Sequence, residues 1–141
     1  MLAKKIKIGL ILLIDLVSFS LALVLMLVFR YGLSGLNPQF QAHLAPFAVL
    51  FILWVIIFYL CNLYSDKAFK NKIELIRVFA WAMLISFTVS MVAFYIAGAV
   101  FGLTPKTNLV IFTLIFAILN LIFRMILAQS HSASARSLRF R

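Results

Sequence analysis

Acidic residues, cysteine and histidine are scarce in this chain. The sequence has 141 residues, of which three are Asp or Glu, one is Cys and two are His. A single cysteine cannot form an intrachain disulfide, and no group of residues has the spacing of a metal site. The sequence also lacks a glycine-rich phosphate loop, paired carboxylates and a Ser/His/Asp set. We therefore expect no metal, no cofactor and no catalysis by this chain alone.

Apolar residues are abundant instead. They make up 66% of the sequence, charged residues make up 11%, and the mean hydropathy is +1.18. A soluble domain averages about 45–50% apolar and about 25% charged residues. A soluble protein of this length would lack the polar surface needed to cover its core, whereas a lipid-facing exterior removes that need. The composition therefore predicts a membrane protein.

Four long apolar runs occupy most of the chain, at residues 8–29, 44–63, 78–101 and 109–127. Each has the length of a helix that crosses a hydrocarbon core of about 30 Å. We expect an all-α fold, an antiparallel bundle of four transmembrane helices that forms one domain over residues 1–128. The polar, basic segment 129–141 cannot bury a core, so we expect it to be disordered.

Basic residues lie mainly on alternate sides of these runs. Of the 13 Lys and Arg residues, all but Arg30 and Lys106 lie at the N-terminus, in the second connection or toward the C-terminal end. Positive residues are retained on the cytoplasmic side of a membrane, so this pattern predicts that both termini are cytoplasmic. The formal net charge of +10 then indicates contact with the bilayer and its anionic lipid headgroups, and no nucleic-acid partner.

The second connection predicts an amphipathic helix that Ser65 or Asp66 would cap. Its apolar stripe has helical spacing and consists of Phe69, Ile73, Ile76 and Ala80. Its charged residues are Lys67, Lys70, Lys72, Glu74 and Arg77. Glu74 is spaced to pair with Lys70 and Arg77. We expect this helix to lie at the inner headgroup layer and to run into the third crossing, as a determinant of topology or as a docking surface for another domain.

Asp15 is the one acidic residue inside a predicted crossing. It lies about 10 Å of helix rise beyond the inner end of the first run, and a carboxylate at that depth has to face the bundle and find a partner. In an antiparallel bundle Asn120 has the same depth, and Arg124 lies one turn nearer the surface. We predict an intramembrane polar cluster of Asp15, Asn120 and Arg124 that clamps the helices. A proton- or substrate-coupling carboxylate, and snorkelling to the headgroups, are the alternatives.

Aromatic residues with a polar tip are placed differently in the sequence. Trp81, Tyr64 and Tyr31 lie near the ends of runs and fit the interfacial belts of a membrane protein. Trp54 lies near the middle of the second run, where its indole N–H needs a partner that the sequence does not identify.

Several short motifs occur in a recognisable order. They are Ile14-Asp15-Leu16, Arg30, Asn62-Leu63-Tyr64, Glu74-Leu75-Ile76-Arg77, and Leu103-Thr104-Pro105-Lys106-Thr107-Asn108-Leu109 followed by Arg124. This order resembles the N-terminal membrane region of bacterial sugar transferases, the polyprenyl-phosphate phosphoglycosyltransferases of exopolysaccharide and O-antigen synthesis. That family continues into a cytoplasmic catalytic domain, to which nothing here corresponds. The resemblance implies an anchor or platform in the bacterial inner membrane, with a catalytic sugar-transferase domain or a second copy as partner.

Two other classes share this size and topology. Small four-helix drug exporters carry an acidic residue in the first helix, although it is usually glutamate and is accompanied by motifs that are absent here. Small four-helix flippase-like proteins of polysaccharide modification also match. In either case Asp15 would take part in the movement of a substrate or a proton across the membrane.

Overall fold

The structure, a computed structural model, describes residues 2–65, 71–101 and 106–139 as four α-helices with short connections. The helices are α1 (Leu2–Tyr31), α2 (Leu36–Leu60), α3 (Lys72–Phe101) and α4 (Lys106–Arg139). Each is long and apolar enough to cross a membrane, and the described part of the chain contains no strand. The prediction of a helical protein with four such helices is therefore confirmed.

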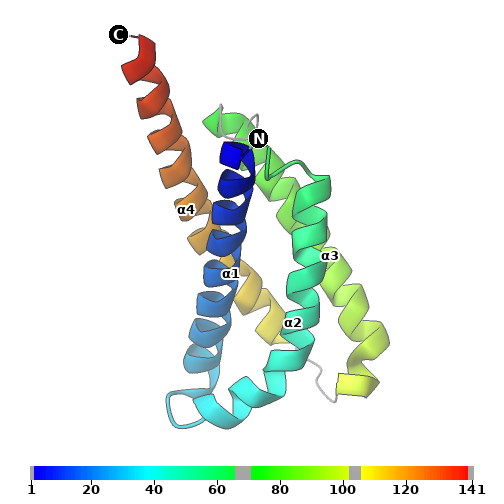
Figure 1. Ribbon diagram of the computed structural model, residues 1–141. Helices are drawn as coiled ribbons and strands as arrows, with labels where there is room; N and C mark the ends of the chain where they lie inside the picture. The colour runs from blue at the N-terminus through cyan, green and yellow to red at the C-terminus, as the bar shows by residue number, and fades with distance from the viewer. Residues whose placement is uncertain (1, 66–70, 102–105, 140–141) are drawn as a thin grey trace.

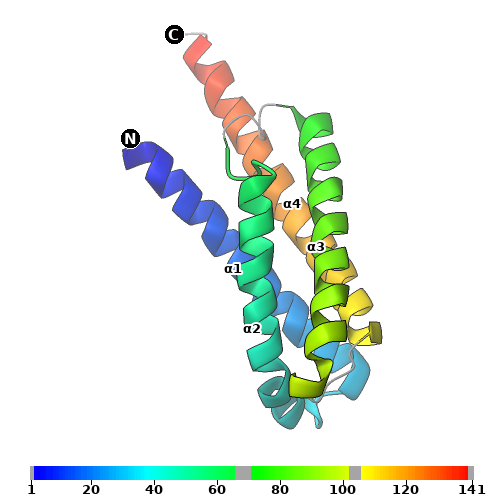
Figure 2. The same cartoon turned by 90° about the vertical axis from the view of Figure 1, so that its right-hand side faces the viewer.

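The helices form a closed ring rather than a row. Successive helices run in opposite directions in Figure 1, so both ends of the described chain lie at the same end of the molecule. Helix α1 packs on α2 and α4, and α3 packs on the same two helices. The contact between α1 and α4 is the most extensive, which joins the first helix to the last. Figure 2 shows that the N-terminal half of α1 leans away from α2 and α3.

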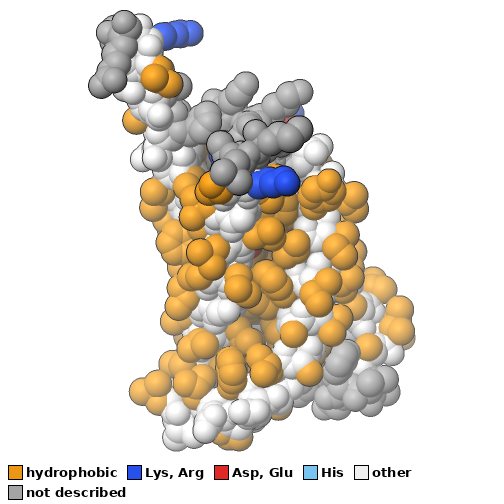
Figure 3. All heavy atoms as spheres, in the orientation of Figure 1, with side chains coloured by type: hydrophobic (Ala, Val, Ile, Leu, Met, Phe, Trp, Pro, Cys, Tyr) orange, Lys and Arg blue, Asp and Glu red, His pale blue; other side chains and the backbone are white. Residues whose placement is uncertain are grey.

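The exterior of the bundle is apolar between its two ends. Leu16, Ile52, Leu114 and Ile122 are among many large apolar side chains that the protein itself leaves exposed. Figure 3 shows hydrophobic side chains over this face of the helices, whereas the visible Lys and Arg side chains lie at the end that holds the termini. Such a surface needs lipid to cover it, because soluble proteins rarely expose apolar patches of this extent.

Two helix ends differ from the sequence expectation. Helix α2 begins at Leu36, earlier than the predicted run, because Pro38 falls in its first turn, where a missing N–H breaks no hydrogen bond. Helix α4 continues to Arg139, so the disorder predicted for 129–141 is corrected for residues 129–139. Extending an existing helix needs no new nucleus, and Ala and Arg favour that extension. In Figure 1 this segment projects beyond the bundle.

Aromatic rings fill the centre of the bundle. Phe19 of α1 meets Phe47 and Trp54 of α2, and Phe112 and Phe116 of α4, with ring centroids 4.6–6.4 Å apart. The partner missing from the sequence analysis is Ser90 of α3, whose hydroxyl accepts the Trp54 indole N–H at 2.7 Å and itself donates to the backbone carbonyl of Ser86. The indole N–H of Trp54, the largest fully buried side chain, therefore has its hydrogen-bond partner on the neighbouring helix α3.

The end of α2 is closed by a Schellman turn. The Leu63 N–H donates to the Phe58 carbonyl and the Asn62 N–H to the Tyr59 carbonyl, both at 3.0 Å. Asn62 has φ 61°, the left-handed conformation that this motif requires. The turn folds the chain back, so that Leu63 and Tyr64 are buried although they lie outside the helix.

This turn yields a test of the fold. We expect Asn62→Gly to leave the free energy of unfolding nearly unchanged, because glycine adopts positive φ without strain. Asn62→Val should lower it by about 1–2 kcal/mol, because a β-branched residue is disfavoured in this conformation. Both free energies are measured by circular dichroism, from unfolding of the variants in mixed detergent micelles. Equal effects of the two substitutions would contradict the assignment of Asn62 to the turn.

Candidate functional site

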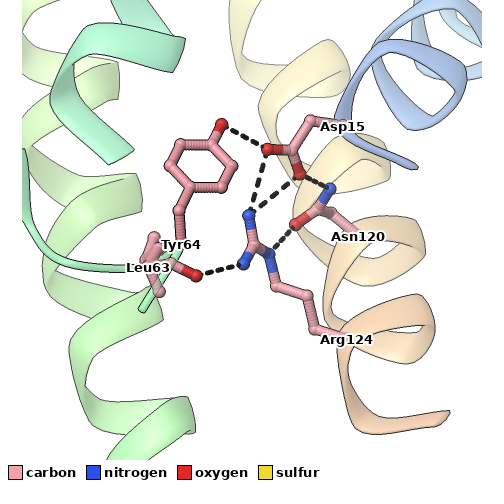
Figure 4. Close-up of polar contacts among 5 residues, drawn as sticks. All are labelled: Asp15, Leu63, Tyr64, Asn120 and Arg124. Carbon is pink, nitrogen blue, oxygen red and sulfur yellow. Dashed lines mark hydrogen bonds and ion pairs between the residues drawn. The ribbon is translucent and has the colours of Figure 1, made fainter. Parts of the chain in front are cut away.

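The three residues predicted to form an intramembrane cluster are in direct contact. Asp15 of α1 accepts hydrogen bonds from the Asn120 amide at 2.7 Å and from Arg124 Nη2 at 2.9 Å and 3.1 Å, all shown in Figure 4. Arg124 Nε donates to Asn120 Oδ1 at 2.7 Å. Each of these residues is at most 1% exposed. The structure therefore contains a fully buried ion pair between the first and last helices.

Two further groups in the site escaped the sequence analysis. The Tyr64 hydroxyl donates to Asp15 Oδ2 at 2.5 Å, and the Leu63 carbonyl accepts from Arg124 Nη1 at 3.0 Å. The expectation that Tyr64 lies in an interfacial belt is wrong, because the Schellman turn directs its ring into the bundle (Figure 4). The signal in the sequence was Asn62 near the end of the second apolar run, since asparagine tolerates the left-handed conformation that reverses the chain.

Aromatic rings surround the guanidinium group of Arg124. Its central carbon lies 5.5 Å from the ring centroid of Phe58 and 5.7 Å from that of Tyr64. These distances are within the range of cation–π attraction, which is strongest where water is absent. The ring contacts add to the hydrogen bonds that offset the cost of taking an arginine out of water.

Tyr64 remains a hydrogen-bond donor over the ordinary pH range. Burial raises the pKa of its phenol far above the usual value, and the adjacent charge of Asp15 raises the pKa further. The protonated hydroxyl therefore donates to the carboxylate rather than competing with it for a positive partner.

The carboxylate of Asp15 has no spare capacity. Its Oδ1 accepts from Asn120 and Arg124, and its Oδ2 accepts from Tyr64 and Arg124. A carboxylate has about four lone-pair positions, so this set of donors occupies them all. The arrangement is therefore suited to join α1, α4 and the turn after α2.

The residues predicted for an interfacial helix lie partly outside the described chain. Lys67 and Lys70 fall in the segment 66–70 that the structure does not describe, as do Asp66 and Phe69. Lys72, Glu74 and Arg77 form the first turns of α3. Glu74 and Arg77 make an exposed ion pair at 2.7 Å.

The start of α3 differs from the prediction in its cap and in its buried face. Asn71 caps the helix, because its Oδ1 accepts the Ile73 N–H at 3.1 Å. Leu75 and Phe79 are the residues that pack into the bundle. The predicted apolar stripe faces outward where it is described, at Ile73, Ile76 and Ala80.

Comparisons with known proteins identify no relative of this chain. No family model, no curated protein and no solved structure matches it. Among the residues that the structure describes, no group of three His, Cys, Asp or Glu side chains could hold a metal ion.

The ion pair is testable with a double-mutant cycle. We expect Asp15→Leu to lower the free energy of unfolding by about 3 kcal/mol, because it leaves Arg124 buried without a counter-charge. Adding Arg124→Leu should restore part of that loss. Unfolding of the four proteins in mixed micelles measures the coupling.

The exposed pair of α3 supplies the matched control. Glu74→Leu and Arg77→Leu should show coupling below about 0.5 kcal/mol, because water screens their charges. A cycle for Asp15 and Arg124 that is equally weak would show that the buried pair does not hold the helices together.

Proposed function

We propose that this protein is a membrane anchor or platform, similar in role to the N-terminal membrane region of bacterial polyprenyl-phosphate sugar transferases. The observation that carries the proposal is the saturated carboxylate of Asp15. All of its acceptor positions are used by groups of the same chain, so the most polar site in the bundle serves to hold three segments together.

The packing of the bundle centre argues against the transporter alternatives. A conducting path needs polar or hydrated groups along its length. Here Phe19, Trp54, Phe112 and Phe116 make mutual ring contacts between the Asp15 cluster and the other end of the helices. Trp54 and Phe116 are each 1% exposed, and Phe112 is completely buried. This buried, closely packed aromatic layer favours an anchor over an exporter or a flippase.

The charge pattern supports one orientation, with both termini in the cytoplasm of a bacterium and the helices antiparallel across its inner membrane. Lys5, Lys72, Arg77, Arg136 and Arg139 are exposed in the first turns of α1 and α3 and at the end of α4. Exposed aromatic residues mark the two interfaces: Tyr59 and Trp81 lie near the charged end, and Tyr95 lies near the other.

Three kinds of partner fit this orientation. Anionic lipid headgroups complement the exposed basic residues, each of which contributes about 1 kcal/mol near such a surface. A catalytic sugar-transferase domain, or a second copy of the chain, would meet the inner face at the first turns of α3 and at the projecting part of α4. The resemblance of the sequence motifs to the transferase membrane region is the reason for naming that domain.

The orientation is tested by reporter fusions. A reporter that is active only outside the cytoplasm should be active after Gly35 and inactive after Arg77 and Arg141. A reporter that folds only inside should show the opposite pattern. The expected result follows from the concentration of Lys and Arg at one end of the helices. An external C-terminal fusion would overturn the proposed topology.

The anchor role is tested by reconstituting the purified chain in liposomes. With a nucleotide-sugar and polyprenyl phosphate we expect no transfer of sugar phosphate, because no described group supplies the nucleophile and charge stabilisation for that step. Under a pH gradient we expect no proton flux. Flux that is lost in Asp15→Asn would favour the transporter instead, and sugar transfer by the chain alone would refute the anchor.

A further inference from the structure

A second buried polar cluster lies at the opposite end of the bundle. It joins His43 of α2, Asn108 of α4 and Tyr31 at the end of α1. The Asn108 side-chain amide nitrogen lies 3.1 Å from His43 Nε2 and donates to the Tyr31 hydroxyl at 3.2 Å. His43 is completely buried and Asn108 is 5% exposed. The Asp15 cluster does not include any of these residues.

The contacts determine the tautomer of His43. Its Nδ1 lies 2.8 Å from the backbone carbonyl of Gln39, which can only accept, so Nδ1 carries a proton. In the neutral imidazole the other nitrogen, Nε2, is then an acceptor. It faces the amide nitrogen of Asn108, which can only donate. The observed orientation of the Asn108 amide is therefore the one that a neutral His43 requires.

The same geometry leaves one strong acceptor unused. Asn108 Oδ1 is buried and has no hydrogen-bond partner in the structure. A buried polar atom without a partner costs about 1–3 kcal/mol. A rotation of the amide by 180° would exchange the two atoms: Oδ1 would face His43 Nε2 and the Tyr31 hydroxyl, and Nδ2 would take the position that has no partner. That second arrangement is favourable only if Nε2 carries a proton.

We propose that His43 and Asn108 form a proton-operated switch, in which protonation of His43 Nε2 is coupled to rotation of the Asn108 amide. In the neutral state the amide donates to Nε2 and to the Tyr31 hydroxyl. In the protonated state Oδ1 accepts from Nε2–H, and the Tyr31 hydroxyl becomes a donor to the same oxygen. One proton therefore reverses the hydrogen bonds that link α1, α2 and α4.

The electrostatic cost of placing a proton on His43 Nε2 depends on the groups that face the imidazole. From α1, Tyr31 faces the imidazole with ring centroids 6.2 Å apart, and the guanidinium carbon of Arg30 lies 6.0 Å from the Tyr31 ring centroid. From α4 the contact is neutral Asn108, and from α2 itself the neighbours are the Gln39 carbonyl and the Phe47 ring. No described carboxylate contacts His43, so the second arrangement depends on the amide oxygen.

The switch does not depend on the anchor role. Its exposure to the pH outside the cell does depend on the proposed orientation, because the cluster lies at the end away from the termini. The hydrogen-bond change can be measured on the purified protein whatever its orientation, so a failure of the switch and a failure of the topology are distinguishable.

The test is a nuclear magnetic resonance titration of the full chain in micelles, from pH 8 to pH 4.5. His131→Gln is used as the background, so that His43 is the one remaining histidine. At high pH we expect Nδ1 protonated and Nε2 bare. As the pH falls, Nε2 should gain a proton while the side-chain amide resonance of Asn108 shifts with the same midpoint.

Matched substitutions separate coupling from coincidence. Asn108→Asp places an acceptor-only group opposite Nε2, so an Nε2–H should be present without any rotation of the side chain, where the parent protein shows a bare nitrogen. The same change at the exposed N-cap, Asn71→Asp, should leave the midpoint unchanged. An Asn108 amide that does not respond when His43 titrates, an Nε2 that is protonated throughout, or a His43 that stays neutral to pH 4.5 in the folded protein would each overturn the proposal.

Discussion

The burial of one aspartate and one arginine inside the same helical bundle is the constraint on which this structure depends. Neither charge is tolerated in a membrane interior without a counter-charge, so α1 and α4 have to meet where Asp15 and Arg124 form their 2.9 Å ion pair. This requirement specifies how α1 and α4 align, because a slip by one helical turn, about 5.4 Å, would separate the charges. This pair joins the two helices that share the most extensive contact of the bundle.

Helix α4 organises both ends of the protein through one winding stripe of buried residues. Asn108, Phe112, Phe116, Asn120 and Arg124 follow one another at four-residue intervals along it and are all buried. Each of these residues lies beside the next on the helix surface, but the stripe that they form turns by about 40° per step, so it winds around α4 and brings this single helix to the His43 cluster, the aromatic layer and the ion pair in turn. The aromatic layer keeps the two polar clusters apart, which is why each is satisfied mainly by its own neighbours.

The turn after α2 links backbone conformation to the buried site. Asn62 in the left-handed conformation reverses the chain, and the Leu63 carbonyl and the Tyr64 hydroxyl then reach Arg124 and Asp15. A connection between two helices would ordinarily lie on the surface and be loosely held. Here Leu63 and Tyr64, directly after α2, are part of the polar cluster, so the cluster also holds the start of this connection against the bundle.

The four helices could be predicted from the sequence because the length and the composition of a membrane crossing are local properties of the chain. The contact among Asp15, Asn120 and Arg124 could also be predicted, because the number of residues fixes the depth along a helix and a buried charge requires a partner. Prediction from the sequence failed for Tyr64, Ser90 and His43, since their contacts depend on how each helix is rotated and on one left-handed residue. It also failed for the end of α4, where polar composition suggested disorder but an established helix extends at little cost. Rotation and turn geometry are properties of the packed bundle, because they arise only when the helices satisfy one another's polar groups.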